Sequence, residues 1–157
     1  MSISRRRAQT AIEALFIIAI ILAGVLIIVP PYLNENRDIS LVVYARNSAS
    51  NACAYLNTGV VINEAGYTPL NVIIKADNYT YHTFQLTSIS MNELDSKIQV
   101  NIIITYSGSA VPEATLETNI KQYIVNDLAS NTNVRLSGGK LYFGGKEVEI
   151  NVDVVRK

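Results

Sequence analysis

Residues 5–31 read RRRAQTAIEALFIIAIILAGVLIIVPP, and this stretch decides how the 157-residue chain is organised. The sixteen residues that follow Glu13 carry no charged or strongly polar side chain, and two prolines close the run. Extending the run back to Gln9 gives 21 residues. A helix needs roughly 20 residues to cross the hydrocarbon core of a membrane. The sequence therefore predicts a transmembrane helix with one carboxylate near its start.

The charges beside this run predict its orientation. Arg5, Arg6 and Arg7 precede it, and only mixed charge follows it. Because basic residues stay on the cytoplasmic side, we expect everything after Pro31 to lie outside the cytoplasm. A conventional cleaved signal has a shorter apolar core followed by a small-residue cleavage site, whereas here the small residue comes before the run.

Composition and single residues argue against several functions. Thirteen basic residues balance thirteen acidic ones. The sequence has no basic patch with interleaved aromatic residues, which argues against a nucleic-acid partner. Cys53 is the only cysteine, which excludes an intrachain disulfide or a cysteine-based metal cluster, and we expect it to be buried. His82, the only histidine, has no ligand partner nearby in sequence, so we expect a strand or surface residue. No catalytic residue, metal or cofactor is predicted, and an enzyme is not expected.

The order of features around residue 8 resembles a known kind of signal. Basic residues, then Ala8, Gln9, a glutamate and an apolar segment resemble the class III signal peptides of type IV pilins, with the archaeal group as the nearest match. In that group the mature chain starts with Gln and carries Glu at its fifth position. Cleavage between Ala8 and Gln9 would make Glu13 the fifth mature residue and Pro30 the twenty-second, and both fit the family. Ala8 and Ala11 depart from it, since glycine and serine are commoner there.

The resemblance implies a division of the chain and a set of site residues. Residues 1–8 would be a signal peptide, removed by a membrane prepilin peptidase at Arg7, Ala8 and Gln9. Residues 9–31 would be the membrane helix and later the filament core, and 32–157 an extracytoplasmic head. The chain would be a structural subunit of a surface filament used in adhesion, a helical homo-oligomer with other pilins as candidate partners. The residues implied in assembly are Glu13, Ile17, Gly24 and Pro30.

Physical chemistry gives Glu13 a role that agrees with this resemblance. A carboxylate facing hydrocarbon costs a few kcal/mol at mid-membrane on insertion scales, so we expect it to lie near the interface or to be paired. Cleavage before Gln9 would create an α-amino group one helical turn away, and the same amine on an adjacent subunit would pair with Glu13 and set the axial register. The alternative is an interfacial glutamate of a plain single-pass anchor.

The chain after the prolines predicts a second helix. Residues 32–37 read as a polar bridge, and a bend or melted segment is predicted around Gly24 and Pro30. A helix within 32–58 is predicted to begin after Asp38 as N-cap and to end at Gly59. Its apolar stripe is predicted to contain Ile39, Val42, Val43, Arg46, Ala49, Cys53 and Leu56, with small residues at Ala45, Ala49 and Ala52 close against a sheet.

Residues 68–157 predict an antiparallel sheet with one additional helix. The apolar period becomes two from Thr68, and Asp77-Asn78 reads as a turn, which together predict a hairpin. KIQVNIIITY at 97–106 alternates as a strand, and a helix over 113–130 should cover the sheet. Two Gly-Gly turns precede a final strand. The predicted fold is α+β: a long N-terminal helix, hydrophobic in its lower half and amphipathic in its upper half, followed by this head.

One sequon and two alternative functions stay open. Asn78-Tyr79-Thr80 is the only N-x-[ST] triplet, so Asn78 is a candidate N-glycosylation site. The alternatives are a minor pilin or pseudopilin of a related assembly system, including the bacterial tight-adherence type, and an uncleaved single-pass anchor of a surface binding domain. Archaeal motility filament subunits usually lack a glutamate at the matching position, so Glu13 argues against them.

Overall fold

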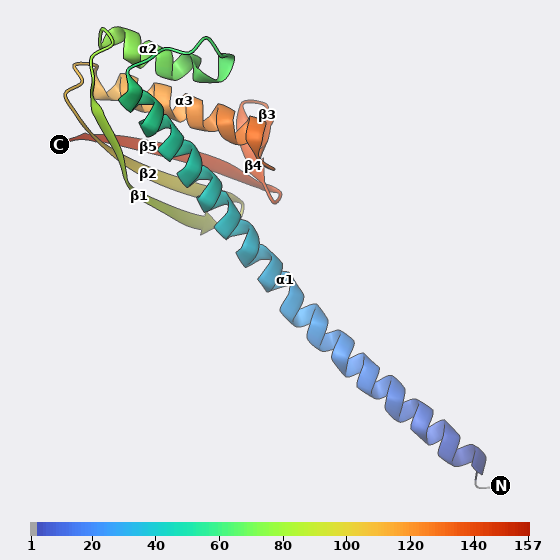
Figure 1. Ribbon diagram of the computed structural model, residues 1–157. Coiled ribbons are helices and arrows are strands. Elements are labelled where there is room, and N and C mark those ends of the chain that lie inside the picture. Colours follow the sequence, from blue (N-terminus) through green and yellow to red (C-terminus); the bar gives the residue numbers. More distant parts are fainter. Residues whose placement is uncertain (1–2) are drawn as a thin grey trace. The chain divides into compact units, whose positions relative to one another are not determined.

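The computed structural model describes the backbone of residues 3–157 (Figure 1), and the side chains of residues 12–29 and 40–157. The chain forms two compact units, Met1–Ile39 and Ser40–Lys157. The second unit is the head, and it contains every strand of the described residues. The α+β fold predicted from the sequence is confirmed.

The first helix, α1 (Ile3–Thr58), has no break in its helical backbone. It continues through both prolines and through the polar residues 32–37, so the melted segment around Gly24 and Pro30 and the N-cap at Asp38 are wrong predictions. Each proline removes only one backbone donor, and the helix continues on both sides of the pair. Gly59, at φ +63°, ends the helix as predicted.

One face of α1 between residues 40 and 58 enters the core of the head. The predicted small residues Ala45, Ala49 and Ala52 are fully buried. Of the predicted apolar stripe, Ala49, Cys53 and Leu56 are buried, Val42 is half-buried, Val43 and Arg46 are exposed, and the side chain of Ile39 lies outside the described residues. The buried face follows the three- and four-residue spacing of a helix and consists of Leu41, Ala45, Ser48, Ala49, Ala52, Cys53, Tyr55 and Leu56.

The segment predicted to begin a hairpin at Thr68 is a helix. A short 3₁₀ turn, η1 (Ala65–Tyr67), leads into α2 (Thr68–Ala76). Proline in the first turn of α2 favours a helix start, and Leu70, Ile73 and Ile74 bury the same face. The strand prediction followed the equally regular alternation of apolar residues and is wrong.

The sheet contains five strands in the order β1-β2-β5-β4-β3. They are β1 (Thr83–Leu94), β2 (Lys97–Ser107), β3 (Arg135–Ser137), β4 (Lys140–Phe143) and β5 (Lys146–Arg156). The predicted sheet was wholly antiparallel, but β2 and β5 pair in parallel, with Ile98 opposite Val148. A parallel pair needs a crossover, and the segment containing α3 (Glu113–Asn131) provides it, with β3 and β4 inserted before β5.

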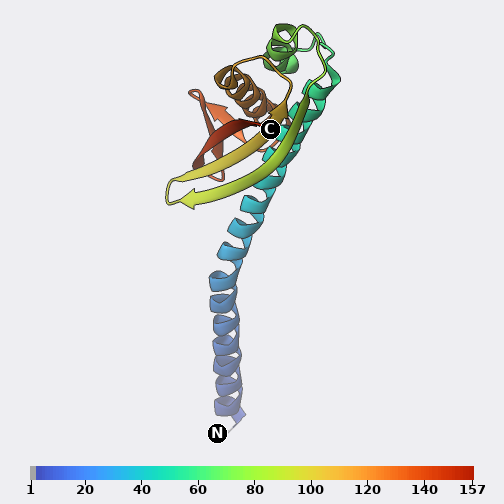
Figure 2. The same cartoon turned by 90° about the vertical axis from the view of Figure 1, so that its left-hand side faces the viewer.

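Helix α3 lies against one face of the sheet, as Figure 2 shows. Its predicted apolar stripe is confirmed, since Leu116, Ile120, Tyr123, Ile124 and Leu128 are all buried. On β2 every second residue from Ile98 to Tyr106 is buried, also as predicted. These residues and the buried face of α1 form one hydrophobic core.

Two Gly-Gly pairs make the turns predicted for the last three strands. Gly138 and Gly139 connect β3 to β4, and Gly144 and Gly145 connect β4 to β5. All four have positive φ, which a two-residue turn of this kind requires and which glycine adopts without steric cost.

Candidate functional site

The apolar stretch of α1 is the largest uncovered hydrophobic surface in the described residues. Ile12–Val29 has a mean hydropathy of 3.1 over 18 residues, and none of this window is buried. The side chains of Phe16 and Leu26 are 68% and 73% exposed. A surface of this size is ordinarily covered by lipid or by protein. The segment is long and apolar enough to cross a membrane. A signal sequence near an N-terminus can have the same length and composition.

The assembly residues expected from the sequence fall into two groups. Glu13 and Ile17 lie in the described apolar stretch and are exposed, and Glu13 is the only charged residue between positions 12 and 29. At Gly24 an added Cβ would meet no described atom within 4 Å. Arg7, Ala8, Gln9 and Pro30 lie in α1, but their side chains are outside the described residues.

Asp77 organises a buried polar cluster in the head that the sequence did not reveal. Its Oδ2 accepts a hydrogen bond from Ser109 Oγ at 2.6 Å, and its Oδ1 accepts one from the backbone N–H of Ala110 at 3.1 Å. Ser109 Oγ in turn accepts from the N–H of Val111 at 3.1 Å. The carboxylate therefore ties the end of α2 to the segment between β2 and α3.

His82 belongs to the same cluster. It is 8% exposed, and its Nε2 lies 3.3 Å from Asp77 Oδ2, within ion-pair distance but outside hydrogen-bond geometry. The prediction of a strand or surface residue without a partner is wrong, because the turn after α2 brings the two residues together. Gly108 makes room for the ring, since a Cβ there would lie 2.8 Å from His82 Nδ1.

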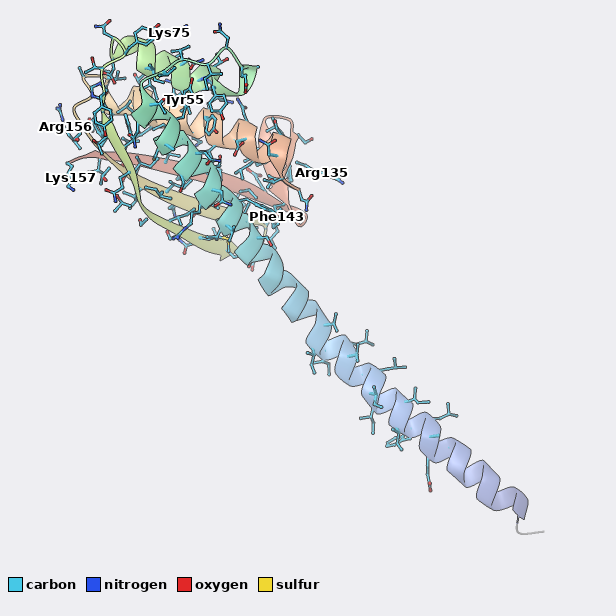
Figure 3. The ribbon with its side chains drawn as sticks, in the orientation of Figure 1. Tyr55, Lys75, Arg135, Phe143, Arg156 and Lys157 are labelled. Carbon is cyan, nitrogen blue, oxygen red and sulfur yellow. The ribbon has the colours of Figure 1, made fainter. Side chains whose placement is uncertain are left out.

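Ser109, His82 and Asp77 are the residue types of a hydrolase triad, but they are arranged differently. In a triad the histidine lies between the serine and the carboxylate, so that it can take the hydroxyl proton. Here the hydroxyl of Ser109 donates directly to Asp77 and is 2% exposed. Arg156, at the end of β5 in Figure 3, donates to the Ser109 carbonyl at 3.5 Å. This geometry joins three segments of the head and does not activate the serine.

A second polar network holds the loop after α1. The hydroxyl of Tyr55, whose place on α1 is labelled in Figure 3, donates to Asn71 Oδ1 at 2.5 Å and accepts from the N–H of Ile62 at 2.8 Å. Asn71 Nδ2 donates to the Ile62 carbonyl at 2.9 Å. These contacts hold the backbone of Ile62 between α1 and α2 and satisfy buried polar atoms.

Cys53 is 5% exposed, as predicted. Burial raises the pKa of its thiol to about 12. Because the thiolate is the reactive form, this cysteine serves as a small core residue.

The described residues contain no group of three or more His, Cys, Asp or Glu side chains that could hold a metal ion. Comparisons with protein-family models, curated proteins and solved structures found no match to this chain. The function is therefore inferred from the residues described above.

Proposed function

We propose that the chain is a structural subunit of an archaeal type IV pilus-like surface filament that supports adhesion. The observation that carries the proposal is the uncovered apolar segment Ile12–Val29, which directly follows the basic-Ala-Gln signal and contains Glu13. The same helix provides core residues to a well-packed head. A subunit that is first held in a membrane and then polymerises through one helix needs this combination.

The proposed processing step gives the helix its second role. A prepilin peptidase cuts between Ala8 and Gln9 on the cytoplasmic side, while the head lies outside. The cut removes the three arginines, which are costly to withdraw from the cytoplasmic surface. It also exposes a new α-amino group on Gln9. The helix then leaves the membrane and enters the filament core.

The energy for this transfer cannot come from the hydrophobic effect alone. Lipid tails are as apolar as leucine, so moving the segment from bilayer to filament removes little apolar surface from water. Close packing and polar pairing must supply the difference. Ala19, Ala23 and Gly24 are small enough to allow neighbouring helices to approach closely. Pairing of Glu13 with the amine of an adjacent subunit would fix the register.

Two other roles use the same segment. A minor pilin or pseudopilin would be processed in the same way but would be scarce in the filament. An uncleaved anchor would keep the arginines and stay in the membrane with its head outside. The two roles differ from the proposed one in abundance and in the position of the N-terminus.

Mass spectrometry of the N-terminal peptide tests the proposal. The protein is taken from its native host in two fractions, filaments sheared from the cells and membranes. We expect a chain that begins at Gln9 and is abundant in the sheared fraction. Ala8→Leu should block the cut and confine the chain to membranes, while Ser4→Ala is the matched control that should be processed normally. A wild-type chain beginning at Met1 or Ser2, found only in membranes, would favour the anchor.

A further inference from the structure

The turn after α2 presents the only sequon of the chain. The N–H of Tyr79 donates to the carbonyl of Ile74 at 3.0 Å, and the N–H of Asn78 donates to that of Lys75 at 3.2 Å. This pair of bonds closes a helix with a residue in the left-handed region. Asn78 is that residue, at φ +52°. A further backbone bond, from Thr80 to Asp77 at 3.0 Å, fixes the next residue.

The helix end explains only one of the two residues that define the sequon. Asparagine tolerates left-handed backbone better than most residues, so the cap by itself accounts for Asn78. Nothing in the turn accounts for the hydroxyl of Thr80. Among the residues whose side chains are described, neither the amide of Asn78 nor that hydroxyl makes a hydrogen bond, and both residues are exposed. A threonine hydroxyl is, however, what an N-x-[ST] acceptor requires.

Exposed aromatic rings surround this turn. Tyr79 is 58% and Tyr81 72% exposed, and Tyr79 also has positive φ, which is unusual for a bulky residue. Gly59 lies beside the turn, since a Cβ there would be 3.5 Å from the carbonyl oxygen of Tyr79. Val60, the next residue, is 59% exposed. The fold therefore fixes two rings and an aliphatic side chain in solvent next to a free amide.

We propose that Asn78 is a glycosylation site and that the attached glycan covers Tyr79 and Tyr81. The modification rests on the proposed function, because it requires the head to lie outside the cytoplasm. The co-reactant is a lipid-phosphate-linked oligosaccharide. The amide nitrogen of Asn78 attacks the anomeric carbon, and the C–N bond forms as the bond from that carbon to the phosphate oxygen breaks. The lipid phosphate leaves with the electron pair, and the amide proton passes to a base of the transferase.

The mass of one peptide tests the site. Trypsin releases Ala76–Lys97 from full-length protein made in the native host. We expect this peptide to carry added mass in the wild type and in Thr80→Ser, which keeps the sequon. Thr80→Ala removes the sequon without changing the capping residue, so its peptide should have the unmodified mass. Chymotrypsin should cut after Tyr79 or Tyr81 several-fold faster in Thr80→Ala than in Thr80→Ser.

A second sequon separates failure of the site from failure of the proposed function. Leu94→Thr creates one at Asn92, an exposed residue of β1. Both acceptors lie in Ala76–Lys97, so the added mass is assigned by fragmentation of this peptide. Added mass on Asn92 with none on Asn78 would show that the transferase reaches the head and would overturn the proposed site. An unmodified wild-type peptide from a chain that begins at Gln9 would overturn it while leaving the filament subunit intact. An unmodified chain beginning at Met1 would overturn both.

Discussion

Replacing Asp77 by alanine should destabilise the head strongly. The Asp77 side chain is 3% exposed. It accepts one hydrogen bond from Ser109 Oγ at 2.6 Å and one from the Ala110 N–H at 3.1 Å. His82 Nε2 lies 3.3 Å away. The substitution removes the acceptor that joins α2, the turn before β1 and the loop before α3.

The magnitude follows from these contacts. A hydrogen bond to a charged group contributes about 1.5–3 kcal/mol. Ser109, which is 2% exposed, would be left with an unpaired hydroxyl, at a further cost of about 1–3 kcal/mol. Removing a buried carboxylate recovers part of its desolvation cost, so we expect a net loss of about 3 kcal/mol. For a unit of about 120 residues with an unfolding entropy of about 2.1 cal/mol/K per residue, this lowers Tm by about 12 °C.

The measurement is thermal unfolding of the full chain in detergent micelles, followed by near-UV circular dichroism of the tyrosines. Asp77→Asn keeps one oxygen acceptor and should give an intermediate Tm. Asp153→Asn is the matched control, because Asp153 is exposed on β5 and its replacement should change Tm little. A Tm of Asp77→Ala equal to that of the control would refute the view that this carboxylate holds the head together.

Four further predictions concern single side chains. Gly108→Ala should lower Tm clearly, because φ is +92° and the added Cβ would lie 2.8 Å from a ring nitrogen, whereas Gly66→Ala, in open space, should not. Cys53 should resist iodoacetamide at pH 8 in the folded chain and react fully in urea, because burial raises its pKa to about 12. Burial, and then the nearby Asp127 charge, raise the pKa of Tyr123. The contribution of the Tyr123 side chain to stability is therefore complete below the pKa of an unfolded tyrosine, about 10, and is lost as pH rises above that value. Because phenylalanine does not ionise, Tyr123→Phe should resist alkaline unfolding better than wild type. Glu13→Gln should reduce sheared filaments while the membrane level stays unchanged; normal filament yield would remove its proposed pairing role.

Strong local patterns made part of the fold predictable. The alternation in β2 and the apolar stripe of α3 each extend over ten or more residues, so the period identifies the element. The Gly-Gly pairs identify hairpins because few other residues adopt positive φ in succession.

The segment TPLNVIIKA shows where period alone misleads. Leu70, Val72 and Ile74 alternate as in a strand, but Leu70, Ile73 and Ile74 also share a helix face. Nine residues are too few for the period to decide between the two. Pro69, in the first turn, was the local signal that favoured the helix.

Contacts between distant residues could not be predicted in the same way. The parallel pairing of β2 with β5 joins residues fifty positions apart, and no short-range pattern specifies it. The bond between Ser109 and Asp77 spans 32 positions, so the cluster around His82 exists only in the folded head. The apolar stretch of α1 could be predicted from the sequence, because the ability of a helix to cross a membrane depends on its length and composition alone.

The position of β5 controls when the head can form during synthesis. It is the last strand of the described chain and the middle strand of the sheet. Until it emerges, the β1–β2 hairpin and the β3–β4 hairpin share no strand. At about 5–20 residues per second, the chain between Val29 and Arg156 takes on the order of 10 s to make. The apolar stretch Ile12–Val29 is thus complete well before the strand that joins the two hairpins of the head.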